Sequence, residues 1–201
     1  MLKIGITGGI GSGKTTVCRI FELLGIPVFY ADNVAKTIMQ TDSQLKNEIL
    51  NAFGTESYSI DGQLNRPYIS SIVFKDQSQL NKLNALVHPA VFRAFDRWIS
   101  EQQEVPYILK EAALLYESES YKMCDLSILV ISPESTRISR IKARDHISEE
   151  EIMLRMKRQF SDEQKMKLAN HILINDENRL LIPQILDLHQ QFLKISRNYD
   201  H

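Results

Sequence analysis

The chain has little cysteine, almost no net charge and no long apolar run, and each shortage excludes a class of protein. Its two cysteines, Cys18 and Cys124, lack the spacing of a metal site, so we expect buried free thiols. A net charge of −1 removes the electrostatic argument for nucleic-acid binding. No apolar stretch approaches about 18 residues and no secretory leader is apparent. We therefore expect no membrane segment and a reducing, cytoplasmic setting.

Short apolar runs alternate with longer amphipathic ones along the chain. Five runs are predicted as strands, at residues 3–7, 26–30, 107–110, 126–132 and 171–175. This alternation is typical of a parallel sheet covered on both faces by helices. The sequence therefore predicts a single α/β domain with three layers and a five-stranded parallel sheet. A last helix over 179–196 is expected to pack on the sheet, with His189 at its surface.

The long segment between the second and third strands has a helical pattern throughout. Gly54 is expected to close one helix, and Asp61 with Gly62 to form a turn. Pro67 and Pro89 are each predicted in the first turn of a helix, where a missing N–H costs nothing.

Residues 8–15, GGIGSGKT, match the pattern GxxxxGK followed by a hydroxyl residue, directly after the first strand. Backbone N–H groups of such a loop and the helix that follows it form a cage for a polyphosphate. Gly8 and Gly13 are expected where a Cβ would not be tolerated. Lys14 would reach the β- and γ-phosphates, and Thr15 would offer its hydroxyl to Mg²⁺. We call residues 8–15 the phosphate loop.

Asp32 follows the second predicted strand. Ligands of open parallel sheets bind at the carboxyl ends of the strands, so this carboxylate is expected near the phosphates. In a phosphoryl-transfer enzyme, such a carboxylate would orient the hydroxyl that receives the phosphoryl group and accept its proton. The alternative is that Asp32 only caps a helix that starts at Asn33.

Positive charge is concentrated at residues 137–167, a segment that contains nine Lys or Arg residues and six Asp or Glu residues. Arg137, Arg140 and Arg144 are spaced to share one helical face, and Ser148 with Glu151 predicts a capping box that opens a second helix. This helical hairpin could close over a triphosphate, or it could be a solvated surface with local ion pairs.

Two acidic residues accompany the third predicted strand. Glu111 ends it, where carboxylates of phosphate-loop enzymes hold Mg²⁺ directly or through water. Glu117 follows six residues later, and it is expected either to meet the acceptor substrate or to sit on the surface.

With these residues in place, nearly the whole chain resembles the dephospho-coenzyme A kinase family. The resemblance follows the order of short motifs: TGGIGSGKTT at 7–16, LGIPVFYAD at 24–32, DGQLNR at 61–66, LNALVHP at 83–89, ALLYE at 113–117, RISRIKARD at 137–145, RMKRQ at 155–159 and ILIN at 172–175. Two departures fall on functional motifs. Tyr30 stands where the family commonly has the first Asp of Asp-Ala-Asp, and Glu111 and Ala113 stand where it has Asp and Pro.

In that family, ATP phosphorylates the ribose 3′-hydroxyl of dephospho-coenzyme A. The resemblance implies a phosphate-loop kinase fold with a nucleotide-binding core (1–32, 105–136 and 168–201), a helical acceptor segment (33–104) and a helical lid (137–167). It implies catalysis by Asp32, Lys14 and Arg140. The implied nucleotide-binding residues are Gly9, Ile10, Gly11, Ser12, Gly13, Lys14, Thr15, Thr16, Arg144 and Asn175.

The acceptor is expected to meet Asp32, Arg66, His88 and Glu117, and Mg²⁺ to be held by Thr15 and Glu111. The expected partners are ATP and dephospho-coenzyme A, bound by a monomer or a small homo-oligomer.

Two rival functions stay open at this point. One is another small-molecule kinase of the same loop class, because fold does not separate substrates. The other is a nucleotide-dependent switch. The switch is disfavoured because the sequence contains no Asp-x-x-Gly and its Asn81-Lys82-Leu83-Asn84 lacks the Asp of a guanine-reading motif.

Overall fold

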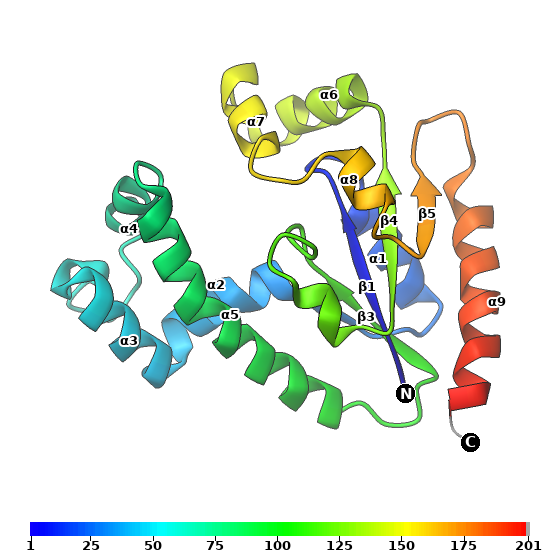
Figure 1. The fold of residues 1–201 in the computed structure, drawn as a ribbon, viewed down its shortest axis with the longest axis horizontal. Coiled ribbons are helices and arrows are strands. Elements are labelled where there is room, and N and C mark those ends of the chain that lie inside the picture. Colours follow the sequence, from blue (N-terminus) through cyan, green and yellow to red (C-terminus); the bar gives the residue numbers. More distant parts are fainter. Residues whose placement is uncertain (200–201) are drawn as a thin grey trace. The chain divides into compact units, whose positions relative to one another are not determined.

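The computed structural model describes residues 1–199 and shows an open parallel sheet with helices on its faces (Figure 1). Within these residues the sheet has five strands in the order β2-β3-β1-β4-β5. The strands are β1 (Leu2–Gly8), β2 (Val28–Tyr30), β3 (Tyr107–Glu111), β4 (Leu126–Ile131) and β5 (His171–Ile174). The prediction of a five-stranded parallel sheet flanked by helices is confirmed. Residues 200 and 201, assigned to the core on sequence, lie outside the described residues.

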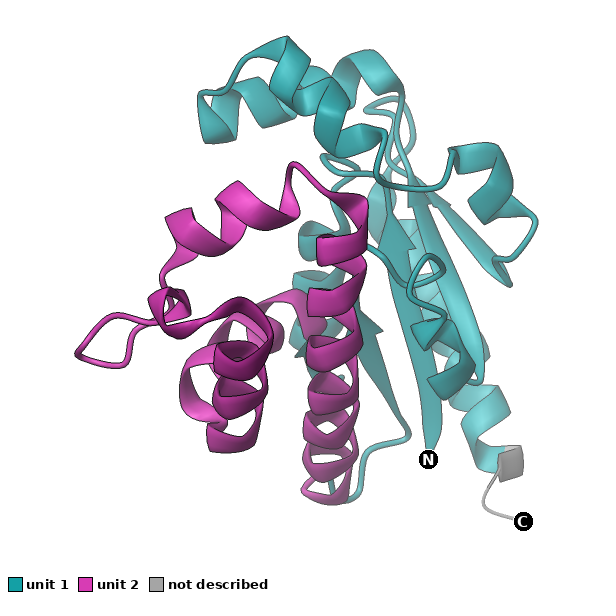
Figure 2. Ribbon diagram, turned by 60° about the vertical axis from the view of Figure 1, so that its left-hand side comes forward, with its two compact units in different colours: residues 1–30, 102–201 teal, residues 31–101 magenta. Residues whose placement is uncertain are grey.

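The described chain divides into two compact units (Figure 2). The first unit comprises residues 1–30 and 102–199, and it holds the whole sheet. The helices of this unit are α1 (Lys14–Leu23), α6 (Glu134–Asp145), α7 (Glu149–Met156), α8 (Asp162–Met166) and α9 (Leu181–Tyr199), with a 3₁₀ turn at Ser120–Met123. None of the described helices is long and apolar enough to cross a membrane.

The central strand β1 shows how the sheet is covered. Leu2, Ile4 and Ile6 are fully buried in one apolar cluster with residues of α1 and α9. The alternate residues face the other side, where a Cβ at Gly5 would lie 2.7 Å from the Leu115 side chain. Glycine at this position therefore lets the segment after β3 pack closely on the sheet.

The two cysteines are free thiols, as predicted. Cys18 is fully buried in the main cluster, whereas Cys124 is only half-buried. Burial raises the pKa of both thiols, that of Cys124 to about 11, so both stay protonated at neutral pH.

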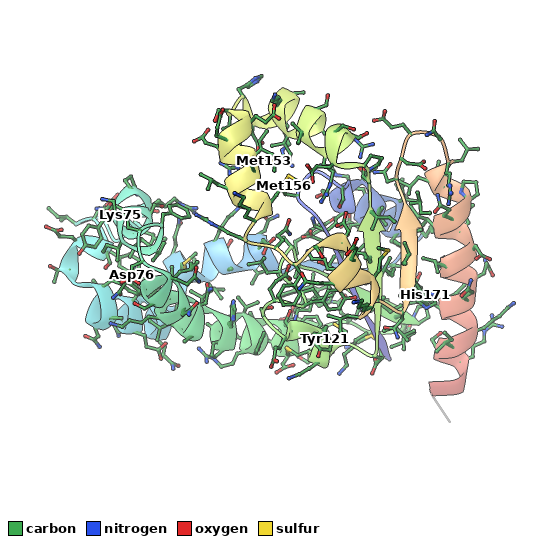
Figure 3. The ribbon with its side chains drawn as sticks, turned by 45° about the horizontal axis from the view of Figure 1, so that its top comes forward. Lys75, Asp76, Tyr121, Met153, Met156 and His171 are labelled. Carbon is green, nitrogen blue, oxygen red and sulfur yellow. The ribbon has the colours of Figure 1, made fainter. Side chains whose placement is uncertain are left out.

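His189 lies on α9 as expected, but it is half-buried rather than fully at the surface. Its Nδ1 lies 2.6 Å from the Oη of Tyr107, a fully buried residue of β3, and the two rings pack with centroids 5.8 Å apart. On β5, His171 packs edge-on against Phe192 of α9 at 5.2 Å (Figure 3). Both histidines therefore help to fasten α9 to the sheet.

These histidines predict a pH-dependent stability. Burial lowers the pKa of His171 and of His189 below the ordinary 6.5, so the unfolded chain binds more protons than the folded one below that pH. The contribution of neutral imidazole is therefore complete above pH 6.5 and is lost as pH falls. Urea denaturation at about pH 7.5 and about pH 5.5 should show a lower free energy of unfolding at the lower pH.

A double variant, His171→Gln with His189→Gln, is the control for this effect. Its free energy of unfolding should decline less between the two pH values than that of the wild type. An equal decline in both proteins would contradict the assignment to these histidines.

The second unit, residues 31–101, is built from helices. These are α2 (Ala31–Thr41), α3 (Ser43–Phe53), α4 (Arg66–Val73) and α5 (Gln77–Ser100), with a 3₁₀ turn at Thr55–Ser57. Gly54 closes α3 with a φ of 89°, and Gly62 forms the predicted turn with a φ of 80°. Pro67 lies in the first turn of α4, as predicted.

The position predicted for Pro89 is wrong. Pro89 lies well inside α5, which runs on to Ser100 although proline removes one helical hydrogen bond. The buried residues on either side, Val87, Ala90 and Phe95, hold the helix together through packing. Tertiary packing here outweighs a local preference for a helix end.

Candidate active site

The phosphate loop connects the carboxyl end of β1 to the first turn of α1. Gly13 precedes the helix with φ at 94°, in the left-handed region, and a Cβ there would collide with the Nδ2 of Asn175. A Cβ at Gly8 would collide with the carbonyl oxygen of Val130 on β4. The predicted need for glycine is thus confirmed at both positions, although at Gly8 the close neighbour is a strand rather than an anion.

Lys14 lies against the loop that it follows. Its Nζ donates to the carbonyl oxygen of Gly8 at 3.0 Å and to that of Gly9 at 3.4 Å, and the residue is only 8% exposed. The neighbouring Thr15 and Thr16 are exposed in the first turn of α1. The helix therefore presents a cation, two hydroxyls and the backbone N–H groups of its first turn beside the loop, a set that suits an anion.

Two residues that are distant in sequence contact the loop from the β4–β5 side. The Nδ2 of Asn175, directly after β5, donates to the carbonyl oxygen of Ser12 at 2.8 Å. Arg140 of α6 directs its Nη1 to the carbonyl oxygen of Gly11 at 3.5 Å and to the Ser132 hydroxyl at 3.3 Å. The structure thus brings Arg140 and Asn175 to the phosphate loop.

The other arginines of α6 differ from Arg140. Arg137 is buried, and its Nη2 lies 3.3 Å from Asp162 at the start of α8. Arg144 is exposed and binds the carboxylate of Asp145 with its Nε at 2.7 Å and Nη2 at 2.9 Å, which lowers the pKa of Asp145. Arg137 and Arg144 are thus each paired with a carboxylate, and Arg137 also lies against the phosphate loop, where a Cβ at Gly9 would collide with its Nη1.

The hairpin itself forms as predicted. The capping box at the start of α7 is confirmed, with the Ser148 hydroxyl accepting from the Glu151 N–H at 3.2 Å and the Glu151 carboxylate accepting from the Ser148 N–H at 3.3 Å. The arrangement places α6 and α7 beyond the carboxyl ends of the strands, on the side of the phosphate loop (Figure 1).

Glu111 is the last residue of β3 and is only 7% exposed. It pairs in register with Ile6 of β1 and Tyr30 of β2. Glu111 therefore lies at the carboxyl-terminal end of the strands, where the phosphate loop begins. The charge of Glu111 adds to burial in raising the pKa of the Cys18 thiol. Within residues 1–199 no group of three or more His, Cys, Asp or Glu residues forms a metal cluster.

Glu117 does not sit on the surface. Its Oε1 accepts from the Phe160 N–H at 2.7 Å and lies 3.1 Å from the Nζ of Lys165. The Lys165 side chain is fully buried and the Glu117 side chain is 11% exposed. The surface alternative for Glu117 is therefore wrong, because its carboxylate is one half of a buried ion pair.

This ion pair predicts a large loss of stability when one partner is removed. Replacing Lys165 with methionine leaves the Glu117 carboxylate buried beside an apolar chain, and the free energy of unfolding should fall by about 3–5 kcal/mol. Urea denaturation measures the loss.

The matched control is Lys122→Met, because Lys122 and Glu119 form an ion pair whose side chains are 59% and 68% exposed. That variant should change stability by less than about 1 kcal/mol. Equal losses in the two variants would contradict a buried ion pair at Lys165.

The second unit carries the other predicted site residues. Asp32 is exposed in the first turn of α2, which begins at Ala31, so it is not the residue that caps a helix from Asn33. Arg66 is the exposed first residue of α4. His88 lies inside α5, half-buried, with its ring stacked on Phe92 at 6.3 Å.

Comparison with known proteins shows which family this chain is similar to. A family model described as dephospho-CoA kinase matches residues 2–180. The dephospho-CoA kinase of Salinibacter ruber is 41% identical over 178 residues, which cover 88% of this chain and 89% of the relative. That of Bacteroides fragilis strain YCH46 is 37% identical over 187 residues, covering 93% and 91%.

Solved structures agree in fold. A crystal structure from Thermus thermophilus superposes with a TM-score of 0.81 at 30% identity and covers 96% of each chain. The dephospho-CoA kinase of Campylobacter jejuni superposes with a TM-score of 0.70 at 23% identity, over 96% of this chain and 97% of that one.

Proposed function

The chain belongs to the dephospho-CoA kinase family, and on that premise we propose how its residues carry out the phosphoryl transfer. Family membership makes the chain a kinase, and it implies ATP as phosphoryl donor and dephospho-CoA as acceptor. The products are coenzyme A and ADP. The single observation that carries the assignment of the donor side is the phosphate loop between β1 and α1, with Lys14 against it.

The phosphate loop is proposed to hold the triphosphate. The N–H groups of residues 9–16 other than Ile10 and Ser12, whose N–H groups are bonded to Gln159 and to Gly9, would surround the β- and γ-phosphates. Lys14 would move from the loop carbonyls to the phosphate oxygens. Arg140, already at the carbonyl oxygen of Gly11, would neutralise charge that develops in the transition state. Arg144 and Asn175 are proposed as further nucleotide contacts, Asn175 toward the adenine end.

Asp32 is proposed as the group that orients the acceptor hydroxyl and accepts its proton. As the bond between the 3′-oxygen and the γ-phosphorus forms, the bond from that phosphorus to the β,γ-bridging oxygen breaks, and ADP leaves. Two observations support this role: Asp32 is exposed, and it lies two residues beyond the carboxyl end of β2. Arg66, His88 and Glu117 are proposed to contact the acceptor, Glu117 from within the segment that follows β3.

The residues proposed for Mg²⁺ offer oxygen ligands, which suit this cation. Thr15 presents an exposed hydroxyl in the first turn of α1, and Glu111 a buried carboxylate at the end of β3. Two protein ligands fit a cation that takes its remaining oxygens from water and phosphate. When bound, Mg²⁺ would offset the charge of the transferring phosphoryl group. We also propose a cytoplasmic location, supported by the two free thiols Cys18 and Cys124.

An acceptor panel tests the proposed reaction. ADP should form in a one-to-one ratio with added dephospho-CoA, and much more slowly with nucleosides, nucleotides or small hydroxyl metabolites. Faster turnover of one of those acceptors would favour another small-molecule kinase. Acceptor-independent hydrolysis as the main reaction would favour a nucleotide switch.

A further inference from the structure

We propose that Gln159 is a positioning residue that holds the phosphate loop in its binding shape before ATP arrives. This inference rests on the proposed function, because it takes the phosphate loop to be the ATP site. Gln159 ends the RMKRQ motif, and neither the sequence patterns nor the reaction gave it a role.

The amide of Gln159 uses both of its polar atoms on the backbone around the loop. Its Oε1 accepts from the Ile10 N–H at 2.7 Å. Its Nε2 donates to the carbonyl oxygen of Ala113 at 2.8 Å and to that of Gly8 at 3.4 Å. One side chain therefore ties the loop to the end of β1 and to the segment that follows β3.

The chain around Gln159 is fixed on both sides, so the amide is held in place. Its own N–H donates to the carbonyl oxygen of Met156, at the end of α7, at 3.0 Å. The next N–H, of Phe160, donates to Glu117, which is paired with the buried Lys165. Two residues further on, Asp162 pairs with the buried Arg137.

Glycine content explains why the loop needs such a tie. Residues 9–13 include three glycines, and each glycine adds backbone freedom that must be lost when the loop orders. Because Gln159 already fixes Ile10, ATP binds a loop that is ordered in advance. Less backbone entropy is then lost when ATP binds. In the ATP complex the phosphates order the loop in any case. Loss of Gln159 should therefore weaken ATP binding more than it slows the chemical step.

Gln159→Ala tests this split. The KM for ATP should rise about tenfold, while kcat at saturating ATP stays within about twofold of wild type, as expected for the loss of one or two hydrogen bonds that act on binding. The KM for dephospho-CoA should not change. Gln159→Glu keeps the acceptor for Ile10 but places a carboxylate against two carbonyl oxygens, so its KM for ATP should rise at least as much.

Asn170→Ala is the matched control. The Oδ1 of Asn170 also accepts a backbone N–H, that of Ser127, at 2.8 Å, but Ser127 lies at the amino end of β4, away from the phosphate loop. This variant should lose stability while the KM for ATP stays at the wild-type value. A tenfold rise in that KM for both variants, or for neither, would overturn the proposal.

Hydrogen exchange supplies a readout that does not depend on activity. Without nucleotide, the Ile10 amide should exchange at least about tenfold faster in Gln159→Ala than in the wild type and in Asn170→Ala. Equal exchange in all three proteins would overturn the positioning role, whatever the reaction is. A wild-type protein that fails to phosphorylate dephospho-CoA would instead overturn the proposed function, and the exchange result would still stand.

Discussion

Lys14→Met is expected to lower kcat for phosphoryl transfer by about 10²- to 10³-fold, the scale on which enzymes lose rate when one preorganised charge-stabilising donor is removed. Methionine retains most of the buried stem of Lys14 but lacks the ammonium that lies 3.0 Å from the carbonyl oxygen of Gly8. Steady-state kinetics at saturating ATP and dephospho-CoA measure the loss.

Lys122→Met provides the matched control for Lys14, because it removes an ammonium from an exposed pair in the same unit. Its kcat should equal that of the wild type. Circular dichroism at the assay temperature should show both variants folded. A folded Lys14→Met enzyme with wild-type kcat would contradict the role of the phosphate loop in catalysis.

Asp32→Asn is expected to lower kcat by about 10²- to 10⁴-fold, the usual range for loss of a general base. Asparagine keeps the shape of the side chain, and its Oδ1 can still accept a hydrogen bond from the acceptor hydroxyl, but it cannot take up the proton of that hydroxyl. The KM for ATP should stay within about twofold of the wild-type value, because Asp32 is not proposed to bind the nucleotide. Single-turnover phosphoryl transfer measures the chemical step.

Asp42→Asn is the control for this variant. Asp42 caps α3 by accepting the Leu45 N–H at 3.0 Å, and asparagine caps helices equally well. This change removes one carboxylate from the same helical unit and should leave kcat unaltered. Wild-type kcat in Asp32→Asn would show that another group accepts the proton, or that none is needed.

The parts of the fold that the sequence predicted are those with a local cause. All five strands follow from short apolar runs, and the phosphate loop follows from a motif whose glycines are required by the backbone. The capping box at Ser148 and the turn at Gly62 are likewise complete within a few residues. Each of these signals lies within one segment of the chain.

The features that were missed depend on residues far apart in the sequence. His189 was expected at the surface because its own helix gives no sign of Tyr107, which is 82 positions away. Glu117 and Lys165 form an ion pair that no local spacing predicts. Gln159 reaches back 149 positions to Ile10, and its place at the end of the RMKRQ motif gives no sign of that contact.

Helical spacing was only a partial guide to the arginines of α6. It placed Arg137, Arg140 and Arg144 on one face, yet each pairs with a different carboxylate: Asp162, Glu177 and Asp145. The three side chains differ because a buried guanidinium must be paired, whereas an exposed one can pair with the nearest carboxylate. Charge spacing alone does not distinguish these environments.

Product identification tests most directly the claim that this chain phosphorylates the 3′-hydroxyl of dephospho-CoA. The protein would be incubated with ATP labelled in its γ-phosphoryl group and with dephospho-CoA, and the products separated and analysed by mass spectrometry. The predicted result is coenzyme A that carries the label on its ribose, in a phosphate that a 3′-nucleotidase removes. Label found only in inorganic phosphate, or in a phosphate that the nucleotidase does not release, would contradict it.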